Sequence, residues 1–224
     1  MKSISLSLKQ HQLFFQIGLV CLADGLVGVS FGALAVTSGF ELWVPLSLSV
    51  LVLAGASEFL FMALIASGGS AIAAAVAGLL VNARLLAFGL SLNQQLGQGW
   101  QRYLGCHLMN DESVVFGISQ TNDYLNKKAY WLCGLGILLL WPFGVFIGAI
   151  LGDAIQDPHV FGLDAMFPAI LIALVLPKLD NSKKRYRAMT GALVSIVSTP
   201  LVPVGMPALL SLVGIFVKRG RQHG

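Results

Sequence analysis

The sequence predicts an all-α, polytopic membrane protein with about seven transmembrane segments. Hydrophobic residues make up 56% of the 224 residues and charged residues only 11%, and the mean hydropathy is +0.81. This composition is far from that of soluble domains. Several apolar stretches also reach the ~20 residues that a helix needs to cross a bilayer. Glycines recur at four-residue spacing, as at Gly28 and Gly32, which lets membrane helices pack closely. We expect a single membrane domain over residues 1–224, embedded in the lipid bilayer.

Six apolar stretches account for the predicted segments. They are residues 13–40, 44–66, 71–92, 130–151, 163–179 and 188–217. Asp24-Gly25 interrupts the first stretch, and three prolines and a glycine interrupt the last. We therefore expect the first segment to be broken or re-entrant and the last to form a broken pair. A weak similarity between the interrupted residues 13–40 and 163–217 suggests an inverted repeat, as in many transporters.

Basic residues set the expected orientation. Residues 93–128, residues 178–187 and the carboxy-terminal tail hold most of them and fall on one side, which the positive-inside rule makes the cytoplasm. The net charge of +4 therefore reflects topology, and no nucleic-acid partner is expected. Lys2 and Lys9 fit this scheme only if residues 13–40 enter the membrane and return. We expect no removable signal peptide. The three cysteines are widely spaced and predict no disulfide framework, no metal site and no cofactor.

A hairpin over residues 50–92, which turns at residues 67–70, carries most of the candidate site. The candidate substrate-binding residues are Ser57 and Glu58 on its first arm, Asn82 and Arg84 on its second, and Asp24 in the preceding stretch. Ionisable groups at such depth are costly and mark functional sites. At 1.5 Å per residue, Glu58 lies ~16 Å and Arg84 ~23 Å from the turn, so an extended arginine spans the offset of ~7 Å. Three arrangements remain possible. Glu58 and Arg84 form a buried pair, or they bind opposite ends of a zwitterion, or Arg84 snorkels to the interface.

These groups suit a small zwitterionic amino acid. Arg84, or the amino end of a broken helix, can bind a carboxylate, and Glu58 or Asp24 can bind an ammonium group. Glu58 and Asp24 are also candidates for proton coupling, because burial disfavours a charged carboxylate. The secondary candidates are Asp111, Glu112 and Asp164. Because Asn-Asp-Glu-Ser at residues 110–113 is typical of a helix amino terminus, we expect capping to be the main role of the first two acids.

The same motifs resemble those of the AzlC-type branched-chain amino acid permease family. The matching pieces occur in family order between Gly28 and Arg187, and are Phe31-Gly32-Ala33-Leu34-Ala35, Leu53-Ala54-Gly55-Ala56-Ser57-Glu58-Phe59, Leu80-Val81-Asn82-Ala83-Arg84, Gly89-Leu90-Ser91-Leu92, Asn110-Asp111-Glu112-Ser113, and Gly162-Leu163-Asp164 leading to Pro168-Ala169. The resemblance implies export of branched-chain amino acids across a prokaryotic plasma membrane, with a small multi-spanning AzlD-type subunit as partner. Three places depart from the family pattern: Glu58 stands where the family usually has Gln, Leu85 where His is common, and Val29-Ser30-Phe31-Gly32 where Pro-Phe-Gly is common.

The sequence thus favours a secondary transporter, not an enzyme, that exports a small aliphatic amino acid with proton coupling. A non-transporting membrane subunit or scaffold is one alternative. An intramembrane lipid-phosphate hydrolase is another, because Glu58-Phe59-Leu60 followed by Ser67-Gly68-Gly69-Ser70 is faintly similar to undecaprenyl-diphosphate phosphatases. The rest of that family's pattern is missing, and a single arginine offers little charge for a diphosphate.

Overall fold

A computed structural model of the chain describes residues 2–92, 95–120, 122–153, 172, 176, 179–202 and 206–217. Within these residues every regular element is a helix, which confirms the all-α class. Three described stretches are long and apolar enough to cross a membrane. They are His11–Thr37 in α1 (Lys2–Thr37), Ala71–Ser91 over α4 (Ala71–Asn82) and α5 (Arg84–Ser91), and α8 (Asp123–Asp153). The count of seven segments and the repeat stay predictions.

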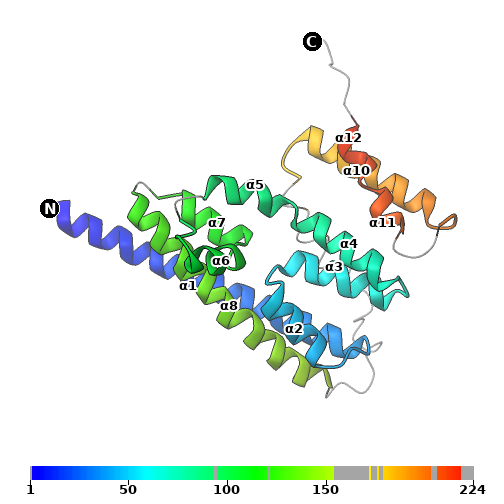
Figure 1. The fold of residues 1–224 in the computed structure, drawn as a ribbon, viewed down its shortest axis with the longest axis horizontal. Coiled ribbons are helices and arrows are strands. Elements are labelled where there is room, and N and C mark those ends of the chain that lie inside the picture. Colours follow the sequence, from blue (N-terminus) through cyan, green and yellow to red (C-terminus); the bar gives the residue numbers. More distant parts are fainter. Residues whose placement is uncertain are drawn as a thin grey trace, which may run out of the picture.

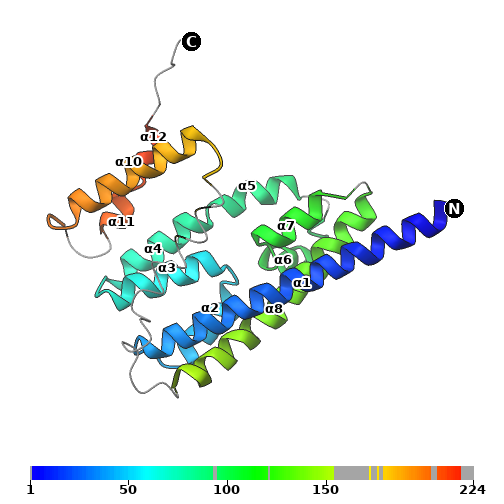
Figure 2. The same cartoon turned by 180° about the vertical axis from the view of Figure 1, so that it is seen from behind.

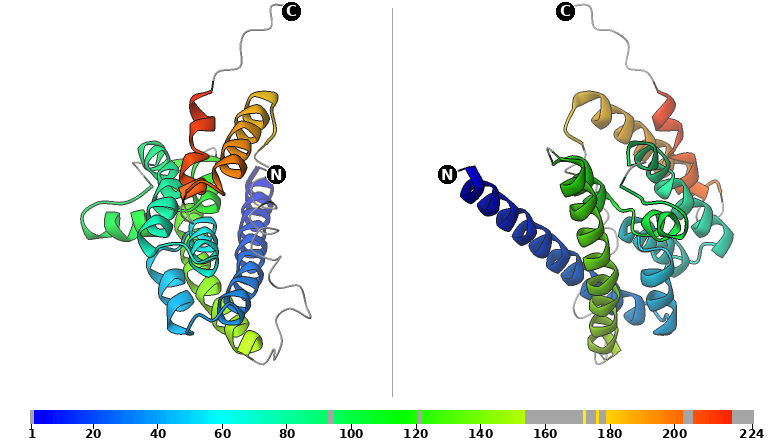
Figure 3. Two further views of the ribbon diagram at one scale, coloured as in Figure 1. Left: turned by 90° about the vertical axis from the view of Figure 1, so that its right-hand side faces the viewer. Right: turned by 60° about the vertical axis from the view of Figure 1, so that its left-hand side comes forward.

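Helices α1 and α8 lie side by side over their carboxy-terminal halves and form the centre of the molecule (Figure 1). Their glycines face one another across the contact. A Cβ atom at Gly32 would collide with the Val145 carbonyl, and one at Gly148 would collide with the Val29 carbonyl. The predicted glycine spacing is therefore used for close packing. Towards its amino terminus α1 diverges from α8 (Figure 3).

The first segment is not broken, contrary to our expectation. Helix α1 runs without interruption from Lys2 to Thr37, through Asp24-Gly25. Gly25 lies against the backbone of Leu140 on α8, so it serves the helix contact and does not end the helix. The helix ends at Gly39, which has a positive φ of 88° and whose N–H donates to the Val36 carbonyl.

The break lies instead in the second segment, which we expected to cross the membrane in one piece. Its two halves are α2 (Trp43–Leu51) and α3 (Gly55–Ala66). Helix α2 runs from the end of α1 towards the middle of α8, where Gly55 lies against the Trp141 ring. Helix α3 then returns, so that Phe59 contacts Phe31 near the carboxy-terminal end of α1, with ring centroids 4.9 Å apart. Residues 43–66 therefore form two helices that turn back on one another, the arrangement expected of a re-entrant pair (Figure 2).

A second re-entrant pair follows on the opposite side. Helix α6 (Trp100–His107) runs inward along α8, and α7 (Asp111–Ile118) runs back outward. Tyr130, near the start of α8, contacts both helices: it donates a hydrogen bond of 2.6 Å to the Gly105 carbonyl of α6, and Gly117 of α7 lies against its ring. Tyr130 is therefore buried within the protein. The turn between the two helices packs deeper, where Leu108 contacts Gly134.

The two pairs remove the conflict that Lys2 and Lys9 posed. Because residues 43–66 enter and return, the full-length α1 begins at the same end of the molecule as residues 95–120 (Figure 1). We infer that the second segment re-enters and that the first crosses, while the number of crossings stays a prediction.

The carboxy-terminal described residues form a smaller helical hairpin. Helix α10 (Ser182–Ser198) is followed by the short helices α11 (Met206–Leu210) and α12 (Val213–Phe216), which pack back onto it at Gly191 and Gly214. At its start, a hydrogen bond from Lys184 holds the pKa of Asp180 below its usual value. The predicted segment 163–179 and the secondary candidate Asp164 lie outside the described residues, apart from positions 172, 176 and 179.

Candidate functional site

The turn between α2 and α3 is held open by a buried glutamate. Leu53 has a φ of +50°, a left-handed conformation that costs energy for a non-glycine residue. The Ala54 N–H donates to Oε1 of Glu58 at 2.8 Å, and the Trp141 indole donates to Oε2 at 3.1 Å. Glu58 is fully buried and has no ion-pair partner among the described residues. It therefore ties the start of α3 to α8.

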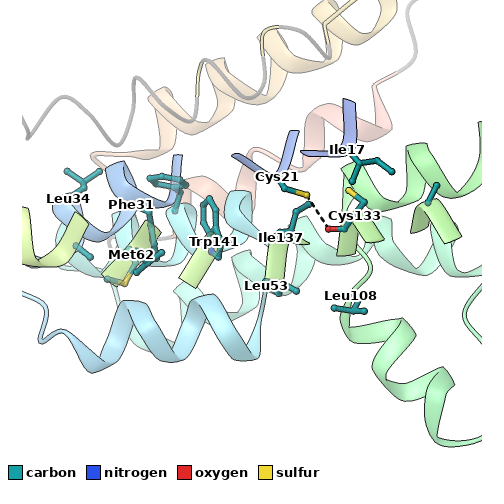
Figure 4. Close-up of a cluster of buried hydrophobic side chains, with 14 of the residues drawn as sticks. Ile17, Cys21, Phe31, Leu34, Leu53, Met62, Leu108, Cys133, Ile137 and Trp141 are labelled. Carbon is teal, nitrogen blue, oxygen red and sulfur yellow. Dashed lines mark hydrogen bonds between the residues drawn. The ribbon is translucent and has the colours of Figure 1, made fainter. Parts of the chain in front are cut away.

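Aromatic packing fixes the same turn from the other side. Phe31 of α1 stacks on Trp141 at 5.9 Å, and Phe59 meets Trp141 edge-on at 6.4 Å. Figure 4 shows Phe31, Met62 and Trp141 together towards one end of this core, with Leu53 and Ile137 further along it. The broken backbone is thus held in one position by a dense apolar cluster.

The turn between α6 and α7 is held by a capping box. The Asn110 side chain accepts from the Ser113 N–H at 2.8 Å, and the Ser113 hydroxyl accepts from the Asn110 N–H at 3.0 Å. Asn110 and Ser113 therefore do the capping that we expected of Asp111 and Glu112. This leaves the Asp111 carboxylate available to pair with Arg84, its Oδ2 lying 3.1 Å from Nη1.

Arg84 lies at a further break in the helices. Ala83 separates α4 from α5, and Arg84 is the first residue of α5. The Arg84 side chain is 37% exposed and pairs with Asp111, so it does not pair with Glu58. The hairpin of α3 and α4 does form, with Gly78 against Ser57, and it turns at Gly68, where φ is +85°.

A cavity of about 110 Å³ lies where these turns meet. Backbone of both re-entrant pairs lines it, from residues 53–56 and 110–112. Two of the residues that line it each have a buried hydrogen-bond donor without a partner in the described part of the chain: Arg84 Nε and Asn110 Nδ2. Buried polar groups are nearly always paired, so these donors indicate a missing acceptor.

Acidic groups line the cavity as well. Asp24 of α1 and Glu112 of α7 lie close enough for their charges to interact, and Asp111 is adjacent. Helices α3 and α7 both begin at the cavity, so their amino-terminal N–H groups and the positive ends of their dipoles lie there too. The remaining wall is apolar, formed by Val27, Leu53, Phe59, Leu85, Ile137 and Trp141. The arrangement offers a carboxylate site, a cation site and an apolar wall within one small space.

The predicted residues divide between this cavity and a second one. Asp24 and Arg84 line the polar cavity together with two of the secondary candidates, Asp111 and Glu112. Ser57, Glu58 and Asn82 line a largely apolar cavity of about 270 Å³ between α2, α3 and α4. In that cavity the Asn82 Oδ1 atom is buried without a partner in the described residues.

Two residues of the site escaped the sequence reasoning. Asn110 was considered only as part of a capping signature, and Trp141 only as one of many apolar residues. A signal for Trp141 does exist: it is an indole with a polar N–H in the middle of an apolar stretch, and a buried Trp needs a hydrogen-bond acceptor. Glu58 is that acceptor.

Broken helical pairs beside a cavity with polar residues, together with long apolar helices, indicate a helical membrane protein. The family comparison agrees with this class. The chain belongs to the AzlC protein family, whose model matches residues 19–155.

Several relatives support this membership. The branched-chain amino acid transport protein AzlC of Bacillus subtilis is 29% identical over 195 residues, which cover 84% of this chain and 76% of the relative. The inner membrane protein YgaZ of Escherichia coli is 27% identical over 183 residues, covering 77% and 73%. A membrane protein of Helicobacter pylori is 25% identical over 192 residues, covering 84% and 83%. No solved structure gives a significant match.

Proposed function

We propose that this chain is the large, transporting subunit of a proton-coupled exporter of branched-chain amino acids in a prokaryotic plasma membrane. The observation that carries the proposal is the pair of unpartnered donors, Arg84 Nε and Asn110 Nδ2, at a cavity that also holds acidic side chains. Donors and acids in one cavity match the two charged ends of an amino acid.

The substrate carboxylate binds Arg84 and Asn110 in this proposal. An arginine donates in a planar fork that suits a carboxylate, and charge-assisted hydrogen bonds of this kind are the strong ones. The amino ends of α3 and α7 favour a negative charge at the same place. Asp111 holds Nη1 of Arg84 and leaves Nε for the substrate.

The substrate ammonium group binds between Asp24 and Glu112. These two carboxylates repel one another when both are charged, and a cation between them relieves the repulsion. The apolar wall then receives the side chain, with Ile137 and Trp141 on one face. The cavity is small, about 110 Å³, which favours a small substrate.

Proton coupling rests on Glu58 and Asp24. A carboxyl group within a membrane marks a proton pathway when no basic residue neutralises it. Glu58 is fully buried, and its described contacts are an amide N–H and an indole N–H, without a cation. Each carboxyl oxygen can form a second hydrogen bond besides the one that it already accepts. Glu58 can therefore take up a proton and keep its bonds to the Ala54 N–H and the Trp141 indole.

The family resemblance extends the proposal to assembly and orientation. A small AzlD-type multi-spanning subunit completes the transporter, and the carboxy terminus faces the cytoplasm with the basic loops. Large apolar side chains cover the outside of α4, where Ile72 is 79% and Leu79 70% exposed. Lipid or a second membrane subunit has to cover such a surface.

The test is export by cells that lack the chromosomal copy and carry the gene on a plasmid. Cells fed dipeptides of Leu, Ile or Val should release the free amino acid, and Arg84→Ala and Asn110→Ala should each abolish this release at unchanged protein level. Arg102→Ala on the outside of α6 is the matched control and should export normally. Unchanged release from the Arg84→Ala variant for all three amino acids would contradict the proposal.

Reconstitution distinguishes transport from a scaffolding role. Purified chain in liposomes, with and without the small subunit, should support counterflow of radiolabelled leucine only when Arg84 is present. A chain that co-purifies with its partner but gives the same flux with Arg84→Ala is a scaffold.

A further inference from the structure

A shallow groove runs along one face of α8, away from the polar cavity. It has a volume of about 360 Å³ and is lined by Tyr124, Lys127, Lys128, Trp131, Leu132 and Leu135. The lining changes with position along the helix. The tyrosine and the lysines lie at the start of α8, the tryptophan follows, and the two leucines lie furthest from the start of the helix. This order is that of a membrane from its surface to its interior.

The lysines of this groove lack acidic partners. Neither Lys127 nor Lys128 forms an ion pair with any residue that the structure describes. Lys128 is held in place by the Phe14 ring of α1, with its Nζ atom 4.8 Å from the ring centroid. Trp131 is held by a hydrogen bond of 2.9 Å from its indole to the Gln95 carbonyl. Two lysines without a described ion-pair partner, of which Lys128 is held by an aromatic ring, thus lie beside an apolar wall.

We propose that this groove is a binding site for an anionic phospholipid. The phosphate lies between Lys127 and Lys128, the Tyr124 hydroxyl lies at the headgroup, and one acyl chain follows Leu132 and Leu135. The charge is complementary, since basic side chains at the cytoplasmic end of a membrane helix attract anionic headgroups. The groove is open to lipid, because Leu132 is 43% and Leu135 40% exposed. This inference does not depend on the proposed transport function.

Native mass spectrometry of the full chain tests the site. The protein, purified in mild detergent, is titrated with phosphatidylglycerol and with phosphatidylcholine of the same acyl chains. We expect one phosphatidylglycerol adduct that survives collisional activation and is at least about ten-fold more abundant than the phosphatidylcholine adduct, as two lysines near a headgroup imply. The Lys127→Gln/Lys128→Gln variant should lose this preference, and Lys127→Arg/Lys128→Arg should keep it.

The control is Lys183→Gln/Lys184→Gln, which removes equal charge from the basic start of α10 and should bind phosphatidylglycerol normally. Inorganic phosphate at millimolar concentration should not displace the adduct, which separates a lipid from a free anion. Equal binding of the two lipids, or an unchanged adduct in the Lys127→Gln/Lys128→Gln variant, would overturn the proposal. Loss of the small subunit instead of the lipid from that variant would make the groove a protein interface and also overturn it.

Discussion

Asp111 forms an ion pair with Arg84 at a position where another anion could otherwise bind. Its Oδ2 lies 3.1 Å from Arg84 Nη1, and the two side chains are 22% and 37% exposed. In the proposed function a substrate carboxylate binds Nε of the same guanidinium whose Nη1 pairs with Asp111, so the two anions share one arginine and repel each other. The partial exposure makes the pair weak enough to exchange partners. We infer that Asp111 limits how tightly the substrate binds and so helps its release.

Asp111→Asn is expected to strengthen substrate binding and slow transport. Removal of the competing charge should lower the half-saturating leucine concentration by up to about five-fold, the factor equivalent to the ~1 kcal/mol upper range of exposed ion pairs. Counterflow at varied leucine concentration measures both effects. Asp180→Asn is the control, because Asp180 pairs with Lys184 on the surface, remote from the cavity. A higher half-saturating concentration in Asp111→Asn would show that Asp111 supports binding and does not compete.

Glu58→Gln tests whether Glu58 ties the broken helix to α8. A glutamine has one carbonyl oxygen, so its NH₂ group must face either the Ala54 N–H or the Trp141 indole. One buried donor then lacks an acceptor, at a cost of roughly 1–3 kcal/mol. Thermal unfolding in detergent should show the loss. In a Trp141→Phe background one of the two donors is already gone, so the same substitution should cost less. Additive effects of the two substitutions would mean that Glu58 and Trp141 are not coupled.

The sequence pointed to these residues but not to their partners. Glu58 and Arg84 stand out because charge inside an apolar stretch is costly, a one-residue property that any reader of the chain can see. Their partners, Trp141 and Asp111, lie 83 and 27 positions away in the sequence. The predicted axial offset between Glu58 and Arg84 could not identify these partners, because it assumed two straight helices. The structure has a break at Leu53 and another at Ala83.

Among the helices, the parallel contact of α1 and α8 sets the positions of the other parts. Gly148 faces the Val29 carbonyl so closely that no side chain fits, and backbone atoms cannot move aside as a flexible side chain can. Gly148→Ala should therefore destabilise the protein by about 1–3 kcal/mol, the usual range for overpacking. Gly18→Ala, on the open side of α1 with nothing within 4 Å, should instead stabilise it by about 0.5–1 kcal/mol.

Thermal unfolding in the same detergent compares the two variants with the parent chain. Equal melting temperatures for Gly148→Ala and Gly18→Ala would show that α1 and α8 are further apart than the structure has them. The comparison is stringent, because the substitution is identical and only the surroundings of the glycine differ.

The same helices show why a break was predicted in the wrong segment. Asp24-Gly25 resembles a helix interruption, yet α1 continues, because its glycines contact α8 and a helix can contain glycine at modest cost. The real break, at Leu53-Ala54, has neither proline nor an asparagine to mark it. It is stabilised by Glu58 and by aromatic residues from α1 and α8, and such tertiary support is invisible to a local pattern.

At the scale of the whole molecule, the order of the described helices is compatible with the predicted inverted repeat, which stays a prediction. A crossing helix, α1, is followed by the re-entrant pair α2–α3. The crossing α4–α5 is followed by the re-entrant pair α6–α7, which enters from the other end (Figure 1). Both turns reach the polar cavity, so a substrate there is one broken pair away from either side. Movement of one pair at a time would open the cavity to each side in turn, as alternating access requires.

Topology labelling tests this arrangement without any assumption about the substrate. Single cysteines are placed at Ser38, Ser67, Gln12 and Gln98 in a chain without Cys21, Cys106 and Cys133, and intact cells are treated with a membrane-impermeant maleimide. Ser38→Cys and Ser67→Cys should both react, because residues 43–66 enter and return on one side. Gln12→Cys and Gln98→Cys should react only after permeabilisation, because α1 begins at the end where α6 enters.

The outcomes separate arrangement from orientation. If residues 44–66 crossed the membrane fully, Ser38→Cys and Ser67→Cys would label from opposite sides, and the cavity would lose one of the two turns that form it. If all four positions exchanged sides together, the arrangement would stand and only the assignment of the cytoplasmic face would be reversed. A basic amino-terminal tail on the same side as the basic loops is what the positive-inside rule requires, and only a re-entrant α2–α3 gives this together with an unbroken α1.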